Sequence, residues 1–338
     1  MTMLKEAIIK LSGKHDLSRD EAYAAMNQIM SGEATDAQIA AFLMGLRLKG
    51  ETVEEIAGCA AVMREKAVRI VSKHQNIIDT CGTGGDASGT FNISTTAAII
   101  ASAAGAVVAK HGNRAVSSRC GSADVLKALG VNIEVSPEQS SKTLDDIGIT
   151  FLFAPLMHGA MKYAANVRKE LGVRTIFNIL GPLTNPARAQ RQVLGVFSPA
   201  LTETLAGVLK ELGSQHALVV HGEGGFDELS TLGWTKISEV RGGELKTYEV
   251  RVDQLGLKTA NADSLKGGDA EQNAAIIRDI LNGRDSAARE IALLNSGAAV
   301  VVAGKANTLK EGIALAARAV DSGAATKKLQ DWVNHTNS

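Results

Sequence analysis

A change of pattern near residue 77 constrains the fold of this chain most strongly. Residues 1–70 show helical patterns only, whereas strand-like and helix-like segments alternate from Ile77 onward. Such alternation is typical of a largely parallel sheet with helices on its faces. We therefore expect an α/β fold class, in which a small all-helical domain adjoins a larger α/β domain with a mostly parallel central sheet. The expected ranges are 1–72 for the helical domain and 73–156 with 187–338 for the α/β domain.

The helical segment has regular start signals and apolar faces. Capping boxes begin at Ser18, Thr35 and Thr52, each with Glu or Gln three residues later. Short helices with one apolar face need another surface to cover them, either the body of the protein or a second subunit. Residues 157–186 interrupt the strand–helix alternation, so we expect them to leave the sheet and join the N-terminal helices.

The expected sheet contains short apolar segments that glycine or proline follows in several places. We predict strands at 77–81, 106–109, 131–135, 149–153, 193–197 and 217–221, and a hairpin over 236–250. Predicted helices include 95–104, 123–129, 201–212, 270–281, 286–294 and 310–322.

Composition excludes several classes of protein. The 36 basic and 36 acidic residues balance, so the chain lacks the basic field of a general nucleic-acid binder. Its three cysteines are widely spaced without a CxxC motif, which argues against a disulfide framework or a zinc site. The N-terminus becomes polar too early for a secretory signal, and no apolar run reaches the roughly 18 residues of a membrane span. We expect a cytoplasmic protein.

A glycine-rich segment follows the first predicted strand. The run Asp79–Asp86 reads DTCGTGGD, and Thr90–Thr95 then opens an Ala/Ile-rich helix. Glycines permit close approach of backbone N–H groups, and a helix start offers unpaired N–H groups to an anion. The segment therefore suggests a phosphate cradle. The alternatives are an ordinary turn and simple N-capping by Ser94 or Thr95.

Three further groups of polar residues have the chemistry of a phosphate site. Lys110–Ser118 combines cations, hydroxyls and Gly112 after a strand, and its His111 suits either a general base or a hydrogen-bonding wall. Asp227 and Glu228 follow a second glycine-rich strand end and fit Mg²⁺, which prefers carboxylates and substrate phosphates. Arg168 suits either the end of a helix dipole or a clamp on a substrate carboxylate.

Taken together, these stretches resemble the anthranilate phosphoribosyltransferase family. The motifs that carry the resemblance are DTCGTGGD at 79–86, TFNIST at 90–95, KHGNRAVSSRCGSAD at 110–124, RKELGVRTIFN at 168–178, GPLTNP at 181–186, and Asp227-Glu228. The resemblance implies transfer of the 5-phosphoribosyl group from 5-phosphoribosyl 1-diphosphate (PRPP) to the amine of anthranilate, with release of pyrophosphate, in tryptophan biosynthesis.

The resemblance also implies roles for individual residues. PRPP would contact Gly82, Gly85, Asp86, Thr90, Asn92, Ile93, Ser94, Thr95, Lys110, His111, Gly112, Asn113, Arg114, Ala115, Val116, Ser117, Ser118 and Ser122. Anthranilate would contact Gly82, Asn113 and Arg168, and Mg²⁺ would be served by Ser94, Asp227 and Glu228. No residue is assigned as a catalytic acid or base, because an aryl amine is already neutral at pH 7. Family members are typically homodimers joined through the helical domain, and association with an anthranilate synthase subunit stays open.

Two other functions compete with this interpretation. A pyrimidine nucleoside phosphorylase would share the fold and run related ribosyl chemistry, but its usual basic loop differs from Lys110–Arg114. A non-catalytic relative that binds nucleic acid is disfavoured by the zero net charge and by the intact Asp227-Glu228 pair.

Overall fold

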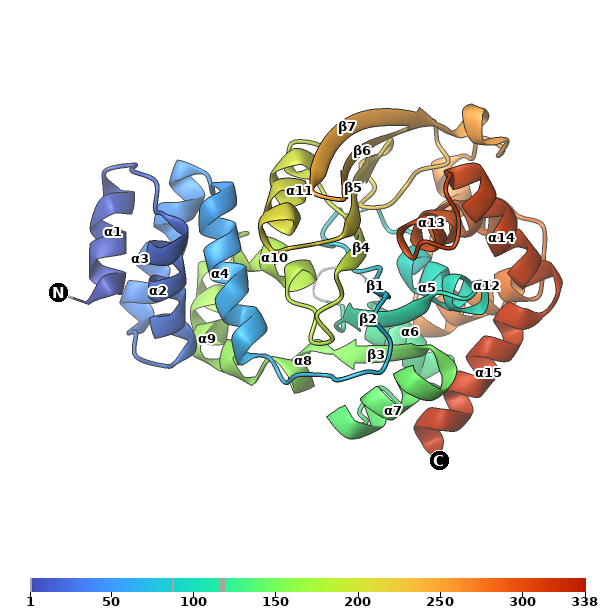
Figure 1. Ribbon diagram of the computed structural model, residues 1–338, viewed down its shortest axis with the longest axis horizontal. Helices are drawn as coiled ribbons and strands as arrows, with labels where there is room; N and C mark the ends of the chain where they lie inside the picture. The colour runs from blue at the N-terminus through green and yellow to red at the C-terminus, as the bar shows by residue number, and fades with distance from the viewer. Residues whose placement is uncertain (1, 87, 116–118) are drawn as a thin grey trace.

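A bundle of helices forms one end of the molecule, and a sheet covered by helices forms the rest (Figure 1). The computed structural model describes residues 2–86, 88–115 and 119–338. The chain begins with α1 (Met3–Ser12), α2 (Arg19–Met30), α3 (Asp36–Lys49) and α4 (Val53–Lys66). The three predicted capping boxes at Ser18, Thr35 and Thr52 are confirmed, because each hydroxyl accepts from the third residue of its helix.

The sheet has seven strands in the order β3-β2-β1-β4-β5-β6-β7. Their bounds are β1 Ile77–Asp79, β2 Val107–Gly112, β3 Ile149–Phe153, β4 Arg191–Gly195, β5 His216–Gly222, β6 Trp234–Arg241 and β7 Glu244–Arg251. Strands β3, β2, β1, β4 and β5 pair in parallel, whereas β5, β6 and β7 pair antiparallel. The predicted mostly parallel sheet and its terminal hairpin are both confirmed.

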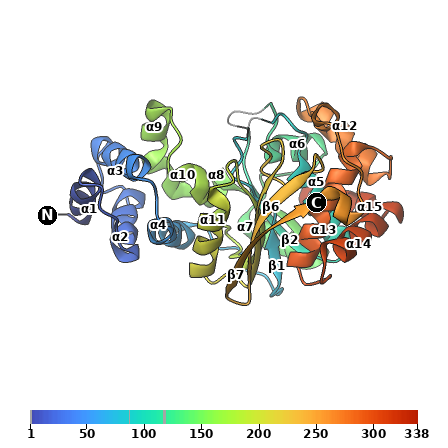
Figure 2. The ribbon, with the colours of Figure 1, turned by 90° about the horizontal axis from the view of Figure 1, so that it is seen from above.

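Helices cover both faces of this sheet, as the view along its edge shows (Figure 2). One face carries α5 (Ile93–Ala103) and the C-terminal helices, and the other carries α11 (Leu201–Glu211). Side chains of β5 alternate between the two cores, with Leu218 and Val220 in one and Ala217 and Val219 in the other. The remaining helices are α6 Ser122–Ala128, α7 Pro137–Ile147, α8 Ala154–Met157, α12 Ala270–Leu281, α13 Ala287–Val302, α14 Leu309–Asp321 and α15 Ala324–Asn337.

The N-terminal helices share a core with the segment that interrupts the strand–helix alternation. Helices α9 (Lys162–Leu171) and α10 (Phe177–Leu180) contribute Ala164, Val167 and Leu180 to the core that also contains α1–α4 and α11. Figures 1 and 2 show α10 between the bundle and the sheet, whereas α9 packs against α2 and α3 of the bundle. This contact links the bundle to the end of the sheet where the glycine-rich loop follows β1.

Several predicted boundaries are wrong. Residues 131–135 form no strand, although Val131 and Ile133 are buried. Their neighbour Asn132 instead donates its N–H to the Thr336 hydroxyl of α15 at 3.1 Å, so the alternating burial reflects packing on a helix. Helix α15 was not predicted at all. Strand β2 extends through Lys110 and His111 to Gly112, because β3 pairs with it up to that residue.

Candidate active site

Hydrogen bonds at Thr83 and Gly84 join the glycine-rich loop after β1 to neighbouring segments. Thr83 N–H donates to the Gly195 carbonyl at 2.8 Å, and its hydroxyl accepts from Phe197 N–H at 3.2 Å. Gly84 N–H donates to Asp227 Oδ2 at 2.8 Å. Gly84 and Gly85 have φ of +63° and +76°, a region that side chains with a Cβ rarely adopt. The glycines therefore serve the turn itself and bring it against Asp227.

Three partly buried carboxylates gather beside this loop. The ligand oxygens of Asp86, Asp227 and Glu228 all lie within 4.8 Å of one another. Desolvation and the nearby Asp86 charge raise the pKa of Asp227 to about 6, and desolvation with the Asp227 charge raises the pKa of Glu228 well above its usual value. Among the described residues, Asp86 Oδ2 and Glu228 Oε2 are buried without a hydrogen-bond partner. Such a set of oxygen donors fits a hard divalent cation.

Lys110 is a buried cation close to these acids. Its ammonium group donates to the Thr80 carbonyl at 3.0 Å, the Thr80 hydroxyl at 3.3 Å and the Ser94 hydroxyl at 3.2 Å. Burial lowers the pKa of Lys110, and the negative charges of Asp79 and Glu228 act against that shift. Lys110 lies on β2 and not in a loop. Its hydrogen bonds to Thr80 and Ser94 connect the residue after β1 to the first turn of α5.

The first turn of α5 keeps hydroxyl groups near the site without using them as helix caps. The N-cap is Asn92, whose side chain makes no cap hydrogen bond, so capping by Ser94 or Thr95 is wrong. Asn92 Nδ2 donates to the Cys120 carbonyl at 3.3 Å, and its Oδ1 accepts from Asn273 at 2.9 Å. Thr95 Oγ1 is buried without a partner among the described residues. Thr90 forms an isolated bridge with Lys266 at the loop's far end.

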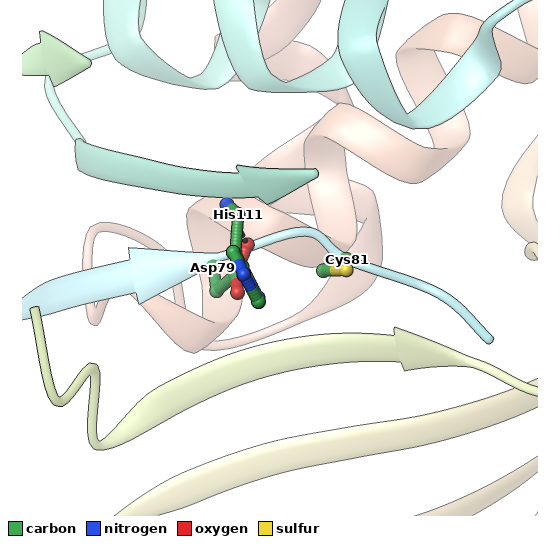
Figure 3. A group of neighbouring side chains, drawn as sticks. All are labelled: Asp79, Cys81 and His111. Atoms are coloured by element: carbon green, nitrogen blue, oxygen red, sulfur yellow. Dashed lines mark hydrogen bonds between the residues drawn. The ribbon is translucent and has the colours of Figure 1, made fainter. Parts of the chain in front are cut away.

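Asp79 and His111 lie together where β1 and β2 end, with Cys81 just beyond them (Figure 3). The Asp79 carboxylate accepts hydrogen bonds from the backbone N–H of His111 at 3.1 Å and from Asn185 Nδ2 at 2.7 Å. Burial raises the pKa of Asp79 to about 6. The His111 ring contacts His158 instead, with 3.1 Å between their Nε2 atoms. Burial lowers the pKa of His111 to about 3 and that of His158 to about 4, so both rings are neutral at pH 7.

The predicted basic loop is only partly directed at the glycine loop. Arg114 forms a 2.9 Å ion pair with Glu134, and Asn113 Oδ1 accepts from Arg114 N–H at 2.7 Å. A Cβ at Gly112 would lie 2.3 Å from Ser122 Oγ, so this glycine makes room for the start of α6. Ala115 N–H donates to Asp124 at 3.0 Å. The predicted contacts of Val116, Ser117 and Ser118 lie outside the described residues.

Arg168 lies in the last turn of α9. It is half-buried, and its guanidinium stands 5.2 Å above the Phe177 ring. Burial lowers the pKa of Arg168 from its ordinary value. An arginine held against an aromatic ring keeps its N–H donors available at the ring's edge, as a carboxylate clamp requires.

Three residues of this site were given no role from the sequence, and a fourth residue was given a different role. The buried network around His111 consists of Asp79, His158 and Asn185. Asp86, which was expected to contact PRPP only, lies with the carboxylates of Asp227 and Glu228. Asp79 and Asp86 flank the glycine run, and Asn185 lies in GPLTNP, so the motifs contained a signal. His158 gave none, because only tertiary structure brings it to His111.

Comparison with known proteins places this architecture in a class of transferases. Residues 5–67 match the helical bundle domain of the glycosyl transferase family, and residues 74–326 match its α/β domain. Together these two matches define a two-domain glycosyltransferase.

Individual relatives narrow the class further. Over 336 residues, which cover 99% of this chain and 97% of the relative, the sequence is 54% identical to anthranilate phosphoribosyltransferase of Acetivibrio thermocellus. A solved structure of the Thermus thermophilus enzyme of that name covers 100% of both chains at 44% identity and a TM-score of 0.93. The Saccharomyces cerevisiae enzyme, solved with PRPP and Mg, covers 99% of this chain and 98% of its own at 28% identity and a TM-score of 0.91. The chain belongs to the anthranilate phosphoribosyltransferase family.

Proposed function

We propose that this protein transfers the 5-phosphoribosyl group of PRPP to the amine of anthranilate and releases pyrophosphate. The observation that carries the proposal is the group Asp86, Asp227 and Glu228 beside the glycine-rich loop. Buried oxygens of Asp86 and Glu228 without a partner among the described residues suit a cation that a diphosphate brings with it. The family relationship supports the same reaction, and it favours the transferase over a nucleoside phosphorylase.

The residues of the site divide between the two substrates. We assign the glycine loop, the first turn of α5 and the Lys110–Ser122 segment to PRPP, and Gly82, Asn113 and Arg168 to anthranilate. Asp227 and Glu228 would hold Mg²⁺, as Asp86 would by its position, and Mg²⁺ would stabilise negative charge on the departing pyrophosphate. Ser94 accepts a hydrogen bond from Lys110, so its hydroxyl is held in place for a role at the same end of the site.

The chemistry needs fixed charge more than proton transfer. The amine of anthranilate is neutral at pH 7, so the site does not have to remove a proton before attack. Burial lowers the pKa of His111 and of His158, which makes both rings weak bases. Fixed donors and correct placement of the amine against the ribose carbon lower the barrier instead. The site accordingly contains many phosphate ligands and no assigned acid–base pair.

Two further properties belong to the proposal. We infer a homodimer through the bundle, because Met3, Ile9 and Leu48 are exposed apolar side chains there. We place the protein in the cytoplasm, since a charged sugar diphosphate does not cross a bilayer freely. No helix among the described residues has the length and apolar character needed to span a membrane. We also propose that the 157–186 segment is part of the helical domain.

One assay tests the function directly. Anthranilate is fluorescent, and mixing it with protein, PRPP and Mg²⁺ should cause a loss of fluorescence that requires all four components. Phosphorolysis of thymidine should be absent. Turnover of thymidine with phosphate, without consumption of anthranilate, would establish the phosphorylase instead.

A further inference from the structure

Arg174 joins the glycine loop to two other parts of the molecule. It lies between α9 and α10, in the segment that connects the bundle with the sheet. Its guanidinium donates through Nη2 to the Gly85 carbonyl and stacks over the Phe197 ring, 4.1 Å from the ring centroid. Its own carbonyl accepts from Nη1 of Arg47, near the end of α3. One residue therefore connects the loop, the end of β4 and the helical bundle.

The carbonyl that Arg174 binds belongs to the peptide between Gly85 and Asp86. The described peptide bonds are trans, so the carbonyl and the Asp86 N–H point in opposite directions. Holding the carbonyl toward Arg174 therefore turns the Asp86 N–H away from Arg174 and fixes the backbone that bears the Asp86 carboxylate. Gly85 has φ of +76°, and a Cβ there would lie 3.1 Å from the Arg174 guanidinium.

Arg174 donates the hydrogen bond that the Gly85–Asp86 peptide accepts. Among the described residues, the other hydrogen bonds that join residues 82–86 of the loop to neighbouring segments act at Thr83 and Gly84, which lie before the Gly85–Asp86 peptide. Both Gly84 and Gly85 are exposed and conformationally permissive, so the peptide that follows them needs an external contact to keep one orientation. Arginine suits this task because its planar group stacks on an aromatic ring while its N–H groups donate in the ring-parallel plane.

We propose that Arg174 is a positioning residue for the diphosphate end of the substrate site. It holds the Gly85–Asp86 peptide in the orientation that receives the diphosphate and its cation, and Arg47 holds Arg174 from the bundle. The proposal rests on the proposed function and deepens it. It predicts that Arg174 affects use of PRPP and Mg²⁺ and leaves use of anthranilate unchanged.

The test compares Arg174→Ala, Arg174→Lys and the control Arg284→Ala, which removes an exposed arginine paired with Asp279. Arg174→Ala should raise KM for PRPP about tenfold, a change that corresponds to the loss of one charge-assisted contact. KM for anthranilate and the melting temperature should stay as in the wild type. Arg174→Lys should recover less than half of the effect, because lysine cannot stack and donate together. Arg284→Ala should match the wild type.

A second variant tests the connection to the bundle. Arg47→Ala should raise KM for PRPP by a smaller factor, and adding it to Arg174→Ala should change nothing further, since both act through one contact. Additive effects of the two variants would overturn the role of Arg47. An unchanged KM for PRPP in Arg174→Ala, or an equal rise in KM for anthranilate, would overturn the proposal.

Calorimetry separates this proposal from the proposed function. If the wild type does not consume anthranilate and PRPP, the function fails, and binding of Mg²⁺ with inorganic pyrophosphate then decides the role of Arg174. Arg174→Ala should weaken that binding about tenfold relative to the wild type. Equal binding by the two proteins, or no binding by either, would overturn the role of Arg174.

Discussion

At the scale of single residues, the site depends on charges that are kept away from water. Desolvation raises the pKa of Asp79, Asp227 and Glu228 and lowers the pKa of Lys110, so it favours the neutral form of each group. Such groups are costly unless a partner compensates them. Lys110 and Asp79 have hydrogen-bond partners, whereas Asp86 Oδ2 and Glu228 Oε2 beside the loop have none among the described residues. We therefore expect a cation there.

Asp227→Asn should therefore change the Mg²⁺ dependence of the reaction. Removing one negative charge from the carboxylate group should raise the Mg²⁺ concentration for half-maximal rate about tenfold or more, because charge–oxygen contacts to the cation are lost. Asp285→Asn, at an exposed acid remote in the fold, provides the matched control. An identical Mg²⁺ titration in Asp227→Asn and wild type would remove Asp227 from the metal site.

Arg168→Ala should act on the acceptor substrate. We expect KM for anthranilate to rise about tenfold or more while KM for PRPP changes little, since a guanidinium matches a carboxylate by two hydrogen bonds. Lys169→Ala removes the exposed neighbouring cation from α9 and should leave both constants unchanged. Equal effects of Arg168→Ala on the two KM values would count against a carboxylate clamp.

His158 should contribute to the pH dependence of stability. Its folded pKa, about 4, is below that of an unfolded histidine, so the unfolded chain binds more protons between about pH 4 and 6.5. The contribution of His158 to the free energy of unfolding is therefore fully present above pH 6.5, and about 3 kcal/mol of it is lost as the pH falls to 4. In urea unfolding, His158→Gln should show a shallower decline than wild type. Parallel curves would show that burial does not hold His158 neutral.

At the scale of elements, the turn between β1 and α5 depends on backbone conformation as well as on side chains. Gly84 combines a positive φ with a hydrogen bond from its N–H to Asp227, and no atom of the described residues lies within 4 Å of a Cβ built there. A side chain at this position would have room, but its backbone would be strained because φ is positive. The strain would displace the N–H that faces the carboxylate group.

Gly84→Val should abolish PRPP binding. A β-branched residue at φ of +63° costs on the order of 1–3 kcal/mol, and relaxation of the loop would relieve it. Gly283→Val provides the control, because Gly283 has φ of +83° and open space but lies in the turn after α12. Calorimetry with PRPP should show binding to Gly283→Val only. Normal binding to Gly84→Val would mean that the loop tolerates a different conformation.

At the scale of the whole molecule, the site lies where the bundle, the α9–α10 segment and the sheet meet. Leu180 and Leu183 share a core with α1–α4, and Arg174 and Arg168 extend from the same segment toward the loop and Phe177. Helix α1 lies at the end of the bundle remote from the sheet (Figure 1), and α1 and α3 carry the exposed apolar residues Met3, Ile9 and Leu48. An interface there would leave the site uncovered.

Leu48→Glu should therefore disrupt the dimer without destroying the fold. Leu48 is 74% exposed, so a charge is tolerated in a monomer but is costly in an apolar interface. Light scattering after size-exclusion chromatography should give a dimer for wild type and a monomer for Leu48→Glu. Leu245→Glu, on the exposed edge strand β7, should remain dimeric. A monomeric wild type would refute the proposed interface.

The sequence by itself determined the local features of this protein. Capping residues, the β6–β7 hairpin and the glycine loop depend on neighbours within a few positions, so their signals lie in short stretches. The alternation of strand-like and helix-like segments indicated a mostly parallel sheet but not the order of its strands. The resemblance to a known family added the reaction and the grouping of motifs.

Only tertiary structure decided which distant residues meet. Residues 131–135 alternate like a strand but pack along α15, and His158 joins His111 across 47 positions. Arg174 reaches Gly85 across 89 positions, and Asp86 meets Asp227 and Glu228 beside the loop. The physical reason is common to all of them. Burial, hydrogen bonding and the pKa of a carboxylate depend on everything packed around a group, and local sequence specifies only a small part of those surroundings.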